Sequence, residues 1–200
     1  MPTLFAAEGG YQIFQLGSAE KAWLYFCIAV ALVALVVGYA MMKSVLAKDA
    51  GTEKMAEIAG AVQEGAMAYI KRQFRTIGFI VIPLAAVVFA TSTEVLSPGG
   101  EGLDRVQSGL WRTVAFLVGA LFSGFIGFLG MWLATRANVR TAAAAKTGSM
   151  DAALQVAFRS GGTIGLFTAG LGLLGATIIV LVFQNTASAI LVGFGFGGSL

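Results

Sequence analysis

Residues 57–93, EIAGAVQEGAMAYIKRQFRTIGFIVIPLAAVVFATST, join a charged segment with helical periodicity to a run that carries no charge. Apolar residues recur at three- and four-residue spacing in the charged part, which predicts one buried helical face. That face consists of Met55, Ile58, Val62, Ala66, Tyr69 and Ile70. No Gly-Pro break separates the two parts, so one helix is expected to leave the membrane and continue into water. Thr52 is the predicted N-cap, and Pro83 is expected to kink the helix.

Uncharged runs of this kind recur along the chain. The gaps between charged residues are 21 residues after Lys21, 18 after Arg75 and 23 after Arg112, and residues 160–200 carry no charge. A helix needs about 20 residues to cross about 30 Å of hydrocarbon. The polar run Gln184-Asn185-Thr186 divides the last stretch. The sequence therefore predicts an all-α polytopic transmembrane bundle with four complete spans and the start of a fifth. These spans are residues 22–42, 76–93, 113–135 and 161–183, with 187–200 incomplete.

The last element is too short to cross a membrane, which leaves two interpretations. It is either a short re-entrant or interfacial tail, or the beginning of a helix in a longer protein of which this chain is the N-terminal portion. We favour the second interpretation, because no charged or aromatic residue closes the segment Gly193–Leu200.

The distribution of positive charge predicts the orientation. Segments 43–75 and 136–159 hold ten of the thirteen Lys and Arg residues, which makes them cytoplasmic by the positive-inside rule. The tail 1–21 is then extracytoplasmic, and helices 2 and 3 extend into the cytoplasm. The net charge of +3 follows from this bias and does not indicate a nucleic-acid partner.

Few residues in the predicted spans are of the types that catalyse reactions, bind metals or transfer ions. The chain has no histidine and one cysteine, Cys27, and the predicted spans contain no charged residue, so they resemble a scaffold rather than an ion relay. Small residues at four-residue spacing are expected to let helix backbones approach closely. They are Gly119, Ser123 and Gly127 (followed by Met131), Gly161 and Gly165, and the glycines of the GxGxxG sequence at 193–198.

Two charged groups leave alternatives open. Glu53, Glu57 and Glu64 with Lys54, Lys71 and Arg72 form either a solvated helix face or a contact for an anionic substrate or lipid headgroup. Arg136 and Arg140 lie one helical turn apart, a spacing that suits either a phosphate group or anchoring of the third span at the membrane surface.

Three segments together resemble the membrane-bound, ion-pumping inorganic pyrophosphatases. EIAGAVQEGAMAYIKRQF at 57–74 is similar to the family's segment entering its second helix, and ATRANVRTA at 134–142 to the segment leaving its third. GFGFGGSL at 193–200 resembles the start of the family's fifth helix. The resemblance covers about residues 43–200, in the family's order.

The resemblance implies a homodimer with sixteen helices per subunit, in the plasma membrane of a bacterium. It implies hydrolysis of magnesium pyrophosphate coupled to export of protons, or of sodium ions in some members, with K⁺ dependence undetermined. This chain would supply outer-ring scaffold helices and be inactive alone. No catalytic, cofactor-binding or metal-binding residue carries over, because the family's site motifs have no counterpart in this sequence. Eight residues match family motifs and are assigned to the structural frame: Glu57, Glu64, Tyr69, Arg72, Gln73, Arg136, Asn138 and Arg140.

The alternative function is a non-enzymatic multi-pass membrane protein, either a transporter subunit or an assembly scaffold. Small-residue packing and spans without charge fit it equally well.

Overall fold

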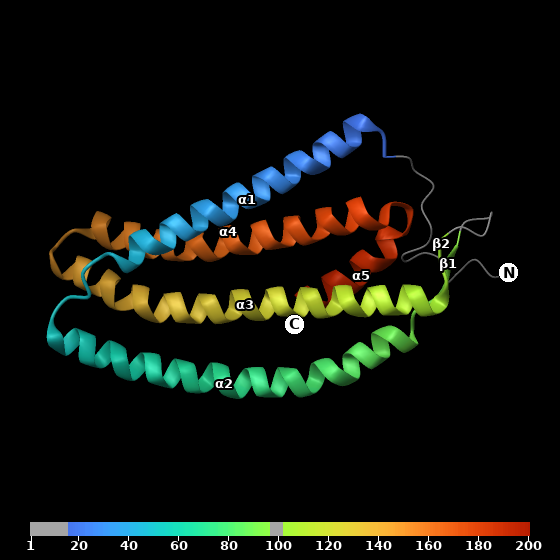
Figure 1. Ribbon diagram of the computed structural model, residues 1–200. Coiled ribbons are helices and arrows are strands. Elements are labelled where there is room, and N and C mark those ends of the chain that lie inside the picture. The colour runs from blue at the N-terminus through green and yellow to red at the C-terminus, as the bar shows by residue number, and fades with distance from the viewer. Residues whose placement is uncertain (1–15, 97–101) are drawn as a thin grey trace. The chain divides into compact units, whose positions relative to one another are not determined.

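The computed structural model describes residues 16–96 and 102–200, and Figure 1 shows the order of their elements. The long helices are α1 (Ser18–Leu46), α2 (Glu53–Ala90), α3 (Arg105–Lys146) and α4 (Met150–Phe183). A 3₁₀ turn, η1 (Gln184–Thr186), leads into α5 (Ala187–Gly198), and a two-stranded antiparallel sheet pairs β1 (Val95–Leu96) with β2 (Gly102–Leu103). Most of the predicted tail lies outside the described residues.

Four helices in the described residues are long and apolar enough to cross a membrane, when α4 and α5 are taken together from Met150 to Gly198. The prediction of an all-α polytopic bundle is therefore confirmed. The predicted spans 22–42, 113–135 and 161–183 lie within helices, whereas 76–93 runs three residues past the end of α2 and 187–200 runs two residues past the end of α5. The boundaries of the spans in the membrane stay a prediction. The β1–β2 pair was not predicted, because two-residue strands leave no periodicity to read.

Helix α2 is continuous through the junction between its charged and uncharged parts, as predicted. Its first turn is capped by Thr52, whose Oγ1 accepts the backbone N–H of Met55 at 3.4 Å. Gly51, at φ +84°, makes the turn before this cap, a conformation that glycine adopts without strain. Helix α4 also begins well before its uncharged run, an extension that was not predicted.

The prediction of a single buried face on α2 was wrong in part. Ala59 and Ile70 are buried, whereas Ile58, Val62 and Tyr69 are 57%, 50% and 55% exposed. Ile58 and Tyr69 are about three helical turns apart, as are Ala59 and Ile70, so the two pairs form parallel stripes about 100° apart. The described chain buries the stripe of Ala59 and Ile70 and leaves the neighbouring apolar stripe of Ile58 and Tyr69 exposed.

The chain divides into two compact units, each described by itself. The described residues of unit 1 are 16–31, 77–96, 102–124 and 171–200. Its core joins Ala115 of α3 and Ile179 of α4 to Ala187 and Ile190 of α5. Within this unit Figure 1 shows α5 folding back against α3.

Three glycines allow this contact between α5 and α3. A Cβ on Gly119 would collide with the carbonyl of Phe194, one on Gly193 with that of Arg112, and one on Gly197 with that of Phe116. The predicted packing role is confirmed for these three positions. At the other predicted positions, Gly127, Gly161, Gly165, Gly195 and Gly198, nothing in the described chain lies within 4 Å of an added Cβ, so the packing role stays a prediction there.

Gln184 is the residue at which the polypeptide turns out of α4. It has φ +42°, which is uncommon for a residue with a Cβ. The predicted break at Gln184–Thr186 is confirmed, because α4 ends at Phe183 and α5 begins at Ala187.

Unit 2 comprises residues 32–76 and 125–170 and contains the charged ends of the helices. Val45 of α1, Leu133 and Ala137 of α3, and Val156 of α4 form its core. Gly38 allows α1 to approach α4, because an added Cβ would lie 3.1 Å from the Phe167 ring. This core fixes the ends of three helices around Arg140.

Candidate functional site

Arg140, on α3, holds the C-terminal end of α1. Its Nη2 donates to the carbonyl of Leu46 at 3.1 Å, and its Nε donates to the carbonyl of Lys48 at 3.0 Å and to that of Leu46 at 3.3 Å. Leu46 is the last residue of α1, so its carbonyl has no partner within the helix. A positive charge there is also favoured by the helix dipole. Arg140 is therefore a helix clamp that fastens α1 to α3.

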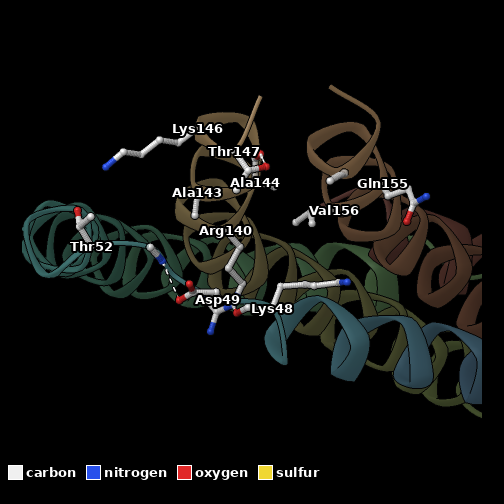
Figure 2. Close-up of a pocket in the computed structure, with 12 residues that line it drawn as sticks. Lys48, Asp49, Thr52, Arg140, Ala143, Ala144, Lys146, Thr147, Gln155 and Val156 are labelled. Atoms are coloured by element: carbon white, nitrogen blue, oxygen red, sulfur yellow. Dashed lines mark hydrogen bonds between the residues drawn. The ribbon is translucent and has the colours of Figure 1, made fainter. Parts of the chain in front are cut away.

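A cavity of about 620 Å³ lies on one side of Arg140 (Figure 2). Its charged lining residues are Arg140, Lys48, Lys146 and Asp49, and Asp49 accepts the backbone N–H of Gly51 at 3.0 Å. In Figure 2 the side chains of Lys48 and Lys146 extend in opposite directions. The two ammonium groups therefore do not converge on one ligand in this cavity.

Arg136, one turn before Arg140, is half-buried and packs on an aromatic ring. Its guanidinium carbon lies 4.3 Å from the centre of the Trp132 ring, and its Nη1 donates to the carbonyl of Trp132 at 3.0 Å. Burial, and then the positive charge of Arg140, lower the pKa of Arg136 from its ordinary value. An arginine remains protonated at neutral pH even so, which leaves two neighbouring cations on α3.

A smaller cavity of about 350 Å³ is lined by both arginines. Trp132 and Gln63 also line it, and the remaining lining is apolar: Leu46, Ala50, Ala56, Ala59 and Val139. Its lining contains no carboxylate. The sequence suggested that these arginines could act together, and the structure places both at one cavity.

In the described chain, no hydrogen bond or ion pair joins the family-motif residues on α2 to this arginine pair. Glu57 pairs with Lys54 at 3.1 Å, and Gln73 donates to the Tyr69 hydroxyl at 2.8 Å, both on the exposed helix surface. Glu64 and Arg72 are also exposed. Exposure fits the solvated-face interpretation of this charge cluster, and the assignment of these residues to a structural frame stays a prediction.

Asn138, the remaining motif residue on α3, is exposed and lines a third cavity of about 220 Å³. This cavity lies between α2 and α3, and Ile58, Val62, Thr135 and Val139 are among its other lining residues. It lies beside the apolar stripe of α2 that the described chain leaves open.

Two contacts in unit 2 were missed by reasoning from the sequence. One is the clamp of Arg140 on the end of α1, and the other is a bond of 2.6 Å from Arg159 Nη1 to Ser44 Oγ. Both join residues more than 90 positions apart in the chain. The available signal was that both arginines lie near the ends of uncharged runs, but charge bias explains that equally well.

Comparison with known proteins finds a family match over most of the chain. The family described as inorganic H+ pyrophosphatase matches residues 32–200. A "K(+)-insensitive pyrophosphate-energized proton pump" of Chloroflexus aurantiacus is 42% identical over 193 residues, which cover 92% of this chain and 25% of the relative. The protein of the same name from Streptomyces avermitilis is 46% identical over 184 residues, covering 86% of this chain and 22% of the relative.

A plant protein is similar as well. "Pyrophosphate-energized membrane proton pump 3" of Arabidopsis thaliana is 34% identical over 212 aligned positions, which cover 98% of this chain and 26% of the relative. The chain thus spans about a quarter of the length of these curated relatives.

Proposed function

This chain belongs to the inorganic H+ pyrophosphatase family, and we propose that it forms part of a pump that couples pyrophosphate hydrolysis to proton export. The observation that carries the proposal is the family match over residues 32–200. The names of the relatives from Chloroflexus and Streptomyces support protons as the exported ion.

Within such a pump, we assign a scaffold role to this chain. Mg²⁺ requires several oxygen ligands, chiefly carboxylates and water. The described residues contain no group of three His, Cys, Asp or Glu side chains that could hold a metal ion. We propose that magnesium pyrophosphate binds to other parts of the pump, as the family resemblance implies. We expect the 200-residue chain alone to be inactive.

The scaffold role has a structural basis in unit 2. The Arg140 clamp and the bond from Arg159 to Ser44 fix the charged ends of α1, α3 and α4 where the uncharged runs end. These contacts would hold the scaffold helices in register beside the helices that carry the chemistry. We further propose a homodimer in a bacterial plasma membrane, with the N-terminus outside and segments 43–75 and 136–159 in the cytoplasm.

The test is phosphate release from pyrophosphate by membranes that carry the complete pump of which we propose this chain is part, with membranes lacking its gene as the control. We expect release that requires Mg²⁺ and does not change when K⁺ replaces Na⁺, because the relatives from Chloroflexus and Streptomyces are named K⁺-insensitive. Release no greater than in the control would contradict the proposal and favour the alternative of a non-enzymatic membrane scaffold.

A further inference from the structure

The cavity lined by Arg136 and Arg140 holds more positive charge than the described chain neutralises. Neither guanidinium lies within 4.0 Å of a described carboxylate, since the ion pair found among those residues joins Lys54 to Glu57. The two arginines instead repel each other, and burial keeps water from screening them fully. A bound anion would remove this imbalance.

The arginines also have hydrogen-bond donors to spare. A guanidinium carries five N–H donors. Arg136 uses one of its nitrogens, Nη1, to reach the carbonyl of Trp132. Arg140 is held in place by the carbonyls of Leu46, Lys48 and Arg136, so its charge is fixed at the cavity wall. The Arg136 fork, stacked on the Trp132 ring, thus has its Nε and Nη2 groups available to a ligand.

The position of the cavity along α3 indicates which anion it meets. Arg136 directly follows the uncharged run 113–135, and Trp132 lies one turn earlier, at a level where tryptophan is enriched beside lipid headgroups. Guanidinium forks match phosphate oxygens, and basic cavities between helices at this depth suit anionic headgroups.

We propose that Arg136 and Arg140 form a binding site for a phosphate group, supplied by the headgroup of an anionic phospholipid. Arg136 would contact two phosphate oxygens, and the clamped Arg140 would add its charge from one turn away. The cavity of about 350 Å³ accommodates a headgroup rather than an acyl chain. This site goes beyond the proposed pump activity, and its test does not depend on hydrolysis or pumping.

The first experiment compares Arg136→Gln with Arg75→Gln in the full chain purified in detergent. Arg75 is a matched control, because it is an exposed arginine that directly precedes the uncharged run 76–93. Native mass spectrometry would measure binding of phosphatidylglycerol and phosphatidylcholine. We expect wild type and Arg75→Gln to retain phosphatidylglycerol preferentially, and Arg136→Gln to bind it about tenfold more weakly.

Arg136→Lys separates the guanidinium fork from the charge, and it should recover only part of the binding. Competition with inorganic phosphate then identifies the source of the anion. Retention of phosphatidylglycerol in excess phosphate supports a lipid site, whereas displacement supports a site for free phosphate and overturns the lipid assignment. Equal binding by Arg136→Gln and Arg75→Gln, or no preference for phosphatidylglycerol over phosphatidylcholine, would overturn the site itself.

A second experiment uses the wild-type protein and so does not depend on the folding of a variant. Phenylglyoxal modifies accessible arginines, and peptide mass spectrometry reports each position. We expect phosphatidylglycerol, but not phosphatidylcholine, to protect Arg136 while Arg75 continues to react. Equal modification of Arg136 in the two lipids would overturn the proposal.

Discussion

Arg140 shows how one side chain can connect helices that are far apart in the sequence. Its guanidinium reaches the carbonyls of Leu46 and Lys48, which lie 94 and 92 residues away. These carbonyls would otherwise depend on water at the end of α1. Hydrogen bonds from a charged donor are stronger than hydrogen bonds between neutral groups. We therefore expect the bonds of Arg140 to stabilise the fold, although the residue lies at the wall of a cavity.

Replacing Arg140 with Gln should destabilise the folded chain by about 1–3 kcal/mol, because the bonds to the end of α1 are lost. Lys146→Gln is the matched control, since it removes the same charge from an exposed residue that lines the same cavity. Thermal unfolding in detergent measures both variants. Equal melting temperatures for the two would show that charge, rather than the clamp, governs stability.

The contact between α3 and α5 depends on the absence of side chains at particular glycines. The carbonyl of Phe116 occupies the space where a Cβ of Gly197 would lie, whereas Gly195, two residues earlier, has open space around it. In lipid, close backbone contact of this kind replaces the hydrophobic effect as the main attraction between helices. The same helix therefore offers both a sensitive position and an insensitive one.

Gly197→Ala should destabilise unit 1 by about 1–3 kcal/mol, because the added methyl group forces α5 away from α3. Gly195→Ala adds the same methyl group without a collision and should leave stability unchanged or slightly raised. The measurement is thermal unfolding of both variants in the same detergent. A loss of stability in Gly195→Ala as large as in Gly197→Ala would contradict the assignment.

The sequence predicted the elements better than it predicted their contacts. Continuity of α2, the Thr52 cap and the break at Gln184–Thr186 all follow from local patterns, and all are present. Which glycines meet a neighbouring backbone does not follow, because Gly119 and Gly127 have the same local pattern but different neighbours. Burial of Ile58 and Tyr69 was predicted wrongly for a related reason. Periodicity identifies an apolar stripe but not the element that covers it.

At the scale of the whole molecule, charge bias predicts which helix ends face the cytoplasm. The prediction places Lys146 in the cytoplasm and Glu94 outside. Cys27, the one native cysteine, is replaced by Ser, and single cysteines are then introduced as Lys146→Cys and Glu94→Cys. In intact cells an impermeant maleimide should label Glu94→Cys and reach Lys146→Cys only after permeabilisation. The reverse pattern would invert the proposed topology.

The candidate site illustrates the same division between local pattern and tertiary contact. The four-residue spacing of Arg136 and Arg140 suited either a phosphate group or anchoring of the third span, and in the structure both residues line one cavity. Arg140 donates most of its hydrogen bonds to backbone carbonyls, whereas Arg136 retains free donors. This difference depends on the fold around the two side chains. No local pattern in the sequence distinguishes these two arginines.

Pyrophosphate-driven acidification of inside-out membrane vesicles tests the central claim most directly, because it requires hydrolysis, coupling and the proposed orientation together. Vesicles that carry the complete pump, this chain included, should acidify when pyrophosphate and Mg²⁺ are added, and a protonophore should abolish the gradient. Phosphate release in the same vesicles without any proton movement, or no response to pyrophosphate at all, would contradict the account of this chain as part of a proton pump.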